Sequence, residues 1–453
     1  MNENYLLTTP LAQQLYHQVA KDLPIIDYHN HLCVADIRNN RQFQNLYEIW
    51  LATDPYKHRL MRICGVEEAY ITGDKAPYEK FQKWCEVFGS LAGTPVYDWS
   101  LAELQNVFGI DLVPAPETAR EIWDTAEKLL ATPAFSAGSY LEKFNVEYAA
   151  PCAGIREDVS AFEDIPGLAP SLRADDILLP DKTFLQELSQ VSNVSIVDLQ
   201  TLTEALATRI SRFAKAGCKF SDHALDNGFV YIRDDGKNQC RLQTVLSGET
   251  LSPADTQALR SEMLRILGKL YCQYHMTMQL HIGAQRYTST RLRNLVGPAG
   301  GFAGIGNTLD VQSLTALLDD LEQTEGLPKT IVFTLNPADN GPISILSGSY
   351  ARDGVPALVT QGPAWWWCDH MQGIKQMLNE FASFSVLSTF VGMTTDSRSL
   401  LSFSRHDYFR RVLCMWIGEK VAAGELPADF SVWKPIVEKI CYQNAKELIQ
   451  EGK

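Results

Sequence analysis

The sequence lacks several features that would place it in other classes of protein. Its ten cysteines include no Cys-x-x-Cys pair, which argues against zinc ribbons and thioredoxin-like redox sites. No apolar run reaches the roughly 18 residues of a membrane-spanning helix, and the first residues lack the basic and apolar regions of a secretory signal. Because unpaired cysteines in a large chain suit a reducing compartment, we expect a protein of the cytoplasm.

Positive charge is also scarce. Lysine and arginine number 40 against 54 aspartate and glutamate residues, which gives a formal net charge of −14. This balance argues against nucleic acid and anionic membrane surfaces as partners, but it permits an acidic small molecule, because a few arginines in a pocket can override a negative exterior. The apolar fraction of 45% is sufficient for a large packed core.

Short apolar runs recur along the chain and mostly alternate with helical patterns. We predict helices at 197–216, 252–276, 309–325, 369–383 and 405–423, and strands at 25–29, 145–151, 167–174, 219–225, 278–284, 330–336, 356–362 and 390–397. Alternation of strand and helix implies parallel strands with right-handed crossovers. Eight such strands favour a closed (β/α)8 TIM barrel, with an open doubly wound sheet as the alternative.

A different pattern, rich in tryptophan and in apolar positions at helical spacing, fills residues 34–144. We therefore predict three segments. Residues 1–33 would hold an N-terminal helix and the first barrel strand, residues 34–144 a helical insertion, and residues 145–453 the remainder of the barrel. The tryptophan-rich insertion could supply a subunit interface, and we expect a homo-oligomer.

The sharpest local signal is His29-Asn30-His31 at the end of the first predicted strand. Residues i and i+2 of a strand project from the same face, so two imidazoles spaced in this way can bind one transition metal ion. Their position agrees with this interpretation, because barrel active sites lie at the carboxyl ends of the strands. Two surface histidines in a loop are the alternative.

Asp396 ends the last predicted strand, which a closed barrel would place beside the first strand. A carboxylate there can complete a two-histidine metal site or exchange a proton with a substrate, although an N-cap aspartate would have the same local sequence. His281 ends the fifth strand, and Ser221-Asp222-His223 lies on the fourth. These residues are either part of the same site or buried polar groups of the core.

Longer motifs resemble the uronate isomerases of the amidohydrolase superfamily. They occur in one order along the chain: Phe-x-x-Leu-Tyr-x-Ile-Trp-Leu (43–51), Tyr56-Lys57-x-Arg59, Thr72-Gly73-Asp74, Ser221-Asp222-His223-Ala224-Leu225-Asp226, His281-Ile282-Gly283-Ala284, Leu335-Asn336-Pro337-x-Asp339-Asn340, Trp365-Trp366, Thr395-Asp396-Ser397-Arg398-Ser399 and Arg405-His406-x-Tyr408-Phe409-Arg410-Arg411. Together with the histidine pair, these similarities span about residues 5 to 450.

The resemblance implies a metal-dependent aldose–ketose isomerase that interconverts D-glucuronate with D-fructuronate and D-galacturonate with D-tagaturonate through an enediol. It implies that His29, His31 and Asp396 bind one divalent metal ion, and that the catalytic residues are Tyr56, Asp396, Arg398 and His281. Zn²⁺ is favoured for this ligand set, with Mn²⁺, Fe²⁺ or Ni²⁺ as alternatives. The expected substrate-binding residues are Arg59, Arg286, Trp366 and Arg398.

Three segments depart from the family pattern. Pro151-Cys152-Ala153-Gly154-Ile155-Arg156 stands where relatives carry Thr-Thr-Asp-Asp-Pro, Gln285-Arg286-Tyr287-Thr288 replaces Leu-Arg-Asn-Asn, and residues 297–303 lack two acidic groups. A site that loses hydrogen-bond partners can lose a substrate by orders of magnitude, so an isomerase of a different sugar acid is an alternative.

Two further alternatives belong to other functional classes. A metal-dependent hydrolase of the same superfamily would usually carry a histidine on the sixth strand or a lysine at the end of the fourth, and neither residue is present there. A non-catalytic barrel that binds sugar acids is the third hypothesis. Metal content and turnover of hexuronates distinguish the three.

Overall fold

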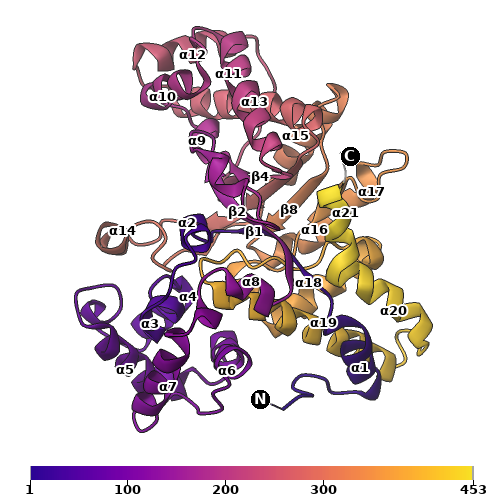
Figure 1. Cartoon of the computed structure of the whole chain (residues 1–453). Helices are drawn as coiled ribbons and strands as arrows, with labels where there is room; N and C mark the ends of the chain where they lie inside the picture. Colours follow the sequence, from indigo (N-terminus) through magenta and orange to yellow (C-terminus); the bar gives the residue numbers. More distant parts are fainter. Residues whose placement is uncertain (1, 451–453) are drawn as a thin grey trace.

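The computed structural model describes residues 2–450. A curled parallel β-sheet lies at its centre, with helices on both sides (Figure 1). The strand order is β1-β2-β3-β4-β5-β8-β9, and every adjacent pair is parallel. The strands are β1 Ile25–Asn30, β2 Val146–Gly154, β3 Ser171–Arg173, β4 Phe220–Asp226, β5 Thr277–Ile282, β8 Thr330–Thr334 and β9 Val359–Gln361. Seven of the eight predicted strands are therefore present. A short antiparallel hairpin, β6 Ala284–Gln285 with β7 Gly304–Ile305, was not predicted.

The curl of the sheet is visible in its packing. β1 and β4 are separated by two strands, yet the rings of Tyr28 on β1 and Phe220 on β4 lie 5.7 Å apart. Both side chains are fully buried and belong to one apolar cluster that also contains Ile331 and Phe333 of β8. Side chains from distant strands meet only when the sheet bends toward closure, so the interior of the curl is a packed core.

The predicted eighth strand, 390–397, is not formed as a regular strand. Gly392 and Asp396 adopt positive φ angles of 75° and 44°, which interrupt an extended backbone. The segment nevertheless lies beside β1, because the Asp396 amide donates to the carbonyl of His29 at 3.0 Å and the His31 amide donates to the carbonyl of Ser397 at 2.9 Å. The observed architecture is thus a seven-stranded half-barrel sheet with an irregular segment along the first strand.

Helices follow β2 along the rest of the described chain. They are α9 Asp175–Leu178, α10 Lys182–Ser192, α11 Leu199–Lys215, α12 Asn238–Ser247, α13 Pro253–Gln273, α14 Thr290–Val296, α15 Val311–Gln323, α16 Asn340–Ser344, α17 Leu346–Ser349, α18 Met371–Phe384, α19 Ser404–Ala422, α20 Phe430–Glu438 and α21 Asn444–Gln450. The five predicted helices correspond to α11, α13, α15, α18 and α19. These helices alternate with strands, as parallel pairing requires.

Residues before β2 are largely helical. The N-terminal helix α1 Pro10–Leu15 begins at the Thr9 cap and continues in a wider turn to Ala20. Residues 34–144 contain α2 Val34–Arg38, α3 Leu46–Trp50, α4 Pro55–Ile63, α5 Pro77–Phe88, α6 Pro95–Phe108, α7 Ala119–Leu130 and α8 Ser139–Lys143. Figure 1 shows α3 to α7 on the opposite side of the sheet from α10 to α13.

Within residues 2–450, no helix combines the length and the apolar character needed to cross a membrane. All ten cysteines are free thiols in this part of the chain.

Candidate metal centre and active site

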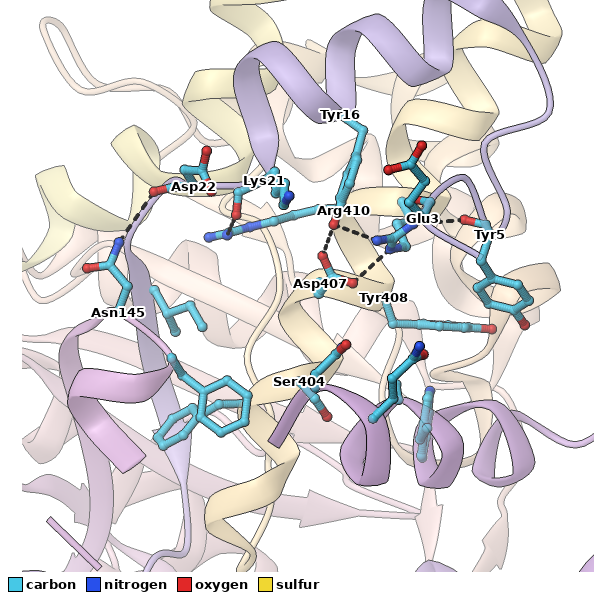
Figure 2. A pocket seen from close by; sticks show the side chains of 18 of the residues that line it. Glu3, Tyr5, Tyr16, Lys21, Asp22, Asn145, Ser404, Asp407, Tyr408 and Arg410 are labelled. Atoms are coloured by element: carbon cyan, nitrogen blue, oxygen red, sulfur yellow. Dashed lines mark hydrogen bonds and ion pairs between the residues drawn. The ribbon is translucent and has the colours of Figure 1, made fainter. Parts of the chain in front are cut away.

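Two cavities of similar size lie at opposite ends of the strands. One, of about 580 Å³, is lined by Ile25 and Asn145, which lie where β1 and β2 begin (Figure 2). Its charged groups largely neutralise one another, as in the 2.7 Å contact between Arg411 and Asp407. The other, of about 540 Å³, opens at the carboxyl ends of the strands. Because ligands of parallel α/β sheets bind at the carboxyl ends, we assign the functional site to the second cavity.

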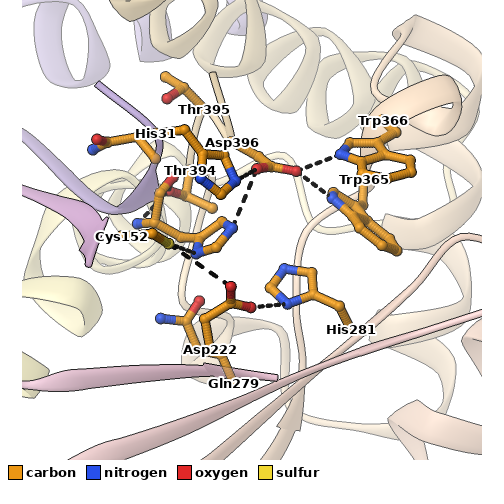
Figure 3. A network of polar contacts seen from close by, with 12 residues as sticks. His31, Cys152, Asp222, Gln279, His281, Trp365, Trp366, Thr394, Thr395 and Asp396 are labelled. Carbon is orange, nitrogen blue, oxygen red and sulfur yellow. Dashed lines mark hydrogen bonds and ion pairs between the residues drawn. The ribbon is translucent and has the colours of Figure 1, made fainter. Parts of the chain in front are cut away.

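Three of the predicted residues converge in this second cavity (Figure 3). Nε2 of His29 lies 3.2 Å from Oδ1 of Asp396, and Nε2 of His31 lies 3.0 Å from the same oxygen. His29 and Asp396 are buried, at 2% and 7% side-chain exposure, whereas His31 is more open at 18%. β1 and the 390–397 segment therefore bring together side chains from opposite ends of the sequence.

These distances fit a shared metal ion. Two ligands of one tetrahedral Zn²⁺ ion, each at about 2.1 Å, lie about 3.4 Å apart, close to the two contacts of Asp396. His29 also belongs to two groups of potential ligands whose donor atoms lie within 4.8 Å of one another: one with His31 and Cys152, the other with Asp222 and His281. Several nitrogen, sulfur and carboxylate donors thus surround a single imidazole.

The second oxygen of Asp396 is held by tryptophan. Oδ2 accepts hydrogen bonds from the indole nitrogens of Trp365 and Trp366. Burial alone would raise the pKa of Asp396, but the hydrogen bonds and charges of His29 and His31 hold that pKa well below its usual range. The carboxylate is therefore ionised and fixed in orientation, as a metal ligand or a proton acceptor must be.

His281 and Asp222 form the floor of the site. Nδ1 of His281 lies 2.7 Å from Oδ1 of Asp222, and both side chains are 3% exposed. Within residues 2–450, Nε2 of His281 is buried and has no hydrogen-bond partner. Burial lowers the pKa of His281, while the charge of Asp222 opposes that effect. A neutral ring with a free, buried nitrogen is available to a bound ligand.

Cys152 of β2 lies between these groups. Its Sγ atom is 3.6 Å from Nδ1 of His29 and 3.8 Å from Oδ2 of Asp222. Burial alone would raise the pKa of this thiol, but the positive charges of His29 and His31 outweigh burial and lower the pKa to about 7.

Tyr56 enters the cavity from α4. Asp54 caps this helix by accepting hydrogen bonds from the amides of Tyr56 and Lys57 at 2.9 and 3.2 Å, and Pro55 occupies the first helical position. Burial raises the pKa of Tyr56, so its phenol stays protonated at neutral pH. In the described part of the chain its buried hydroxyl has no hydrogen-bond partner, and Tyr56 lines the cavity.

The predicted arginines differ in their availability. Arg398 lines the cavity, is exposed, and makes no ion pair among residues 2–450. Arg286 also lines the cavity, but it pairs with Asp226 at 2.9 Å. The Arg59 guanidinium stacks 4.6 Å above the Trp367 ring and is not among the residues that line the cavity. Of the three, Arg398 is the arginine left free to meet a carboxylate.

Sequence reasoning missed two residues of this site. Arg173 at the end of β3 lies 3.2 Å from Asp222 and lines the cavity. Cys152 was noted only as a departure from a family pattern, yet it contacts His29. The carboxyl-end position of each residue on its strand is the signal that could have found them. Arg156, in the same altered segment as Cys152, instead pairs with Asp176 at 2.6 Å on the surface.

A curled parallel sheet with histidines, a carboxylate and a tyrosine at the carboxyl ends of its strands is the architecture of an α/β enzyme. The chain belongs to the family described as glucuronate isomerase, whose model matches residues 1–449. It is an isomerase of that family.

Known proteins of this family are similar over nearly their whole length. The uronate isomerases of Shouchella clausii (strain KSM-K16) and Histophilus somni (strain 2336) are each 39% identical to the chain, with 98% of this chain and 97% and 98% of theirs covered. The crystal structure of uronate isomerase from Thermotoga maritima superposes with a TM-score of 0.92 at 31% identity, over 99% of both chains. Glucuronate isomerase from Caulobacter crescentus shares the fold at a TM-score of 0.91 and 24% identity, over 100% and 97% of the two chains.

Proposed function

We propose that this chain interconverts D-glucuronate with D-fructuronate and D-galacturonate with D-tagaturonate, as a metal-dependent aldose–ketose isomerase. The observation that carries the proposal is the convergence of His29, His31 and Asp396 with Tyr56 and His281 in one cavity. Family membership supports the same reaction class. A volume of about 540 Å³ accommodates a six-carbon sugar acid.

His29, His31 and Asp396 would hold one divalent metal ion. Two imidazole nitrogens and a carboxylate suit Zn²⁺, which we favour, and also Mn²⁺, Fe²⁺ or Ni²⁺. When bound, such an ion supplies Lewis-acid stabilisation of the charge that develops on the substrate's carbonyl oxygen. The other steps fall to side chains of the protein.

Isomerisation transfers one proton between adjacent carbons and one between the oxygens on them. The ionised Asp396 is the base that accepts a proton from substrate, and the protonated phenol of Tyr56 is the acid that supplies one. His281, whose Nε2 atom is free, would donate to or accept from a substrate hydroxyl. The enediol is the intermediate common to both directions.

The substrate carboxylate would bind to arginine at the mouth of the cavity. We assign this role to Arg398, because it is exposed and free of ion pairs among the described residues. A guanidinium binds a carboxylate through two parallel hydrogen bonds, which fixes the orientation of the sugar. Trp366 would cover one face of the substrate. Arg286 and Arg59 would contribute to substrate binding while Arg286 stays paired with Asp226 and Arg59 stays stacked on Trp367.

The test is turnover of purified, metal-loaded protein with each hexuronate. We expect the ketose to form from D-glucuronate or D-galacturonate, and deuterium from solvent to enter the carbon that receives the proton. Conversion of another sugar acid, with neither hexuronate used, would favour the alternative substrate. The cavity wall near Tyr287, Pro298 and Ala299 is where such a change of specificity would arise. No turnover of any of these sugar acids contradicts the proposal.

We further propose that the protein is a cytoplasmic homo-oligomer. The helical segment 34–144 is the predicted interface, although its four tryptophans, Trp50, Trp84, Trp99 and Trp123, are buried within the chain. Sedimentation of the purified protein tests the oligomeric state.

A further inference from the structure

The two ring nitrogens of His29 face different partners. Nε2 points to Asp396 at 3.2 Å, and Nδ1 points to the sulfur of Cys152 at 3.6 Å. A neutral imidazole that binds a metal ion through one nitrogen carries its proton on the other. With the ion on the Nε2 side, where His31 and Asp396 also lie, the Nδ1 proton of His29 is directed at the thiol.

The thiol has a second polar neighbour. Sγ of Cys152 lies 3.8 Å from Oδ2 of Asp222, whose other oxygen accepts a hydrogen bond from Nδ1 of His281 at 2.7 Å. An ionised carboxylate only accepts hydrogen bonds, so the Cys152 S–H group donates to Asp222. The sulfur lone pairs are then left for the N–H group of His29 and for the ring of His31, which also interacts with this thiol. One chain of contacts therefore connects His29 to His281 through Cys152 and Asp222.

From this geometry we infer that Cys152 is a positioning residue of the metal centre: its sulfur accepts a hydrogen bond from the Nδ1–H group of His29 and thereby holds Nε2 toward the ion. The inference rests on the proposed function of His29 as a ligand. Partners on the far nitrogen of a ligating histidine fix its tautomer and ring orientation, and they are usually carboxylates, carbonyls or water. This chain uses a thiol, and it links that thiol to Asp222.

Direct ligation by Cys152 is the competing role for the same sulfur. It would place the ion beside Nδ1 of His29, the nitrogen 3.6 Å from the sulfur, and one nitrogen of each of His29 and His31 lies within 4.8 Å of that sulfur. Asp396 contacts His29 and His31 only through Nε2, so an ion on the Nδ1 side loses that shared carboxylate. The positioning role keeps all three proposed ligands on one ion.

The test compares Cys152→Ala, Cys152→Ser and the control Cys218→Ala. Cys218 is also buried and also donates to a protein oxygen, but its sulfur bonds the carbonyl of Phe220 at 3.2 Å. The dissociation constant of each apo protein for Zn²⁺ is measured by competition with a chromogenic chelator. We expect Cys152→Ala to weaken binding about 10- to 100-fold. Cys152→Ser, whose hydroxyl accepts from His29 and donates to Asp222, should restore most of the affinity.

A second readout separates positioning from ligation. The wild-type protein loaded with Co²⁺ should lack the intense near-ultraviolet charge-transfer band of a thiolate ligand. Such a band, removed in Cys152→Ser, overturns the inference, as does equal Zn²⁺ affinity in Cys152→Ala and Cys218→Ala. Absence of Zn²⁺ binding by the wild type overturns it as well. Failure of the proposed isomerisation shows instead as absent hexuronate turnover, which leaves the affinity comparison unaffected.

Discussion

Oδ1 of Asp396 lies 3.2 Å from Nε2 of His29, although the two residues come from opposite ends of the chain. The contact exists because the 390–397 segment lies along β1 and is bonded to it through the Asp396 amide. A buried carboxylate that contacts two imidazoles has its greatest effect where charge changes during the reaction.

Asp396→Asn should lower kcat by at least about 1,000-fold, because the amide cannot accept a proton from substrate and is a poor metal ligand. The fold should persist, since the amide oxygen can still accept from the two tryptophans. Steady-state kinetics and thermal melting check the two parts separately. A wild-type rate with a fully occupied metal site would contradict the assignment of this residue.

Removal of the metal ion should abolish turnover and lower the melting temperature. An ion that binds the folded state stabilises it in proportion to the logarithm of its concentration over Kd. Dialysis against a chelator, followed by addition of Zn²⁺, tests both effects by activity assay and calorimetry. Full activity in metal-free protein, as measured by elemental analysis, contradicts the prediction.

His29→Ala provides the corresponding genetic test of metal binding. The variant should bind substoichiometric Zn²⁺ under conditions that saturate the wild type, because one of the three proposed ligands is gone. His275→Asn is a suitable control: His275 is exposed, and asparagine tolerates its positive φ of 53°. Metal content equal to that of the control would exclude His29 as a ligand.

The two indoles that bond Asp396 allow a matched comparison. Trp366→Phe keeps an aromatic ring but removes a donor to Oδ2, whereas Trp367→Phe removes a donor to the carbonyl of Ala303 at 2.9 Å. A hydrogen bond to a charged group contributes about 1.5–3 kcal/mol, so we expect Trp366→Phe to lower kcat roughly tenfold or more. Trp367→Phe should lower it less. Equal effects on kcat would show that the bond to Asp396 has no special role.

The sequence predicted most of the sheet, because apolar periodicity is a local property that survives in the folded chain. Seven strands and the five helices predicted after residue 145 lie where the pattern placed them. The eighth segment failed as a strand because Gly392 and Asp396 adopt positive φ, which no apolar pattern reveals. The proximity of His29 and His31 could be predicted because they stand only two positions apart on one strand.

Contacts between strands were harder to predict. The proximity of Cys152 to His29 depends on the pairing of β1 with β2. The ion pair of Arg286 with Asp226 joins the residue after β6 to the last residue of β4. The sequence predicted Arg286 as a substrate-binding residue, but it could not show that the guanidinium also pairs with Asp226. The role of Arg286 toward substrate stays a prediction. Whether a polar side chain is available to bind substrate depends on the side chains that lie next to it in the folded protein.

A buried ion pair next to Tyr56 should be important for stability. Lys57 lies 2.7 Å from Asp54 and 3.1 Å from Glu103, and its side chain is 2% exposed. Removal of one partner from a buried pair costs about 3–5 kcal/mol, so Lys57→Met should lower the free energy of unfolding by that amount. Denaturant titration measures the change.

An exposed pair of the same spacing provides the control for Lys57. Lys83 lies 2.7 Å from Glu86, also three residues away, but both side chains are open to solvent. Lys83→Met should leave the unfolding midpoint nearly unchanged, because water already screens that pair. Equal losses in the two variants would show that burial does not determine the strength of the Lys57 contacts.

His223 should make stability depend on pH. It is fully buried on β4, and burial lowers its pKa to about 4. The unfolded chain, with a pKa near 6.5, takes up a proton as pH falls through that value, while the folded state does so only near pH 4. This contribution to stability is therefore complete above pH 6.5 and is lost progressively toward pH 4. Between pH 7 and pH 5 the loss is about 2 kcal/mol.

His223→Asn removes the titrating ring, so its free energy of unfolding should fall less between pH 7 and pH 5 than that of the wild type, by about 2 kcal/mol. Denaturant titrations at the two pH values give the difference within each protein, which cancels any constant cost of the substitution. His275→Asn, at an exposed position, should keep the wild-type pH dependence. An unchanged difference in His223→Asn would mean that His223 is protonated in the folded protein near pH 6, contrary to the effect of its burial.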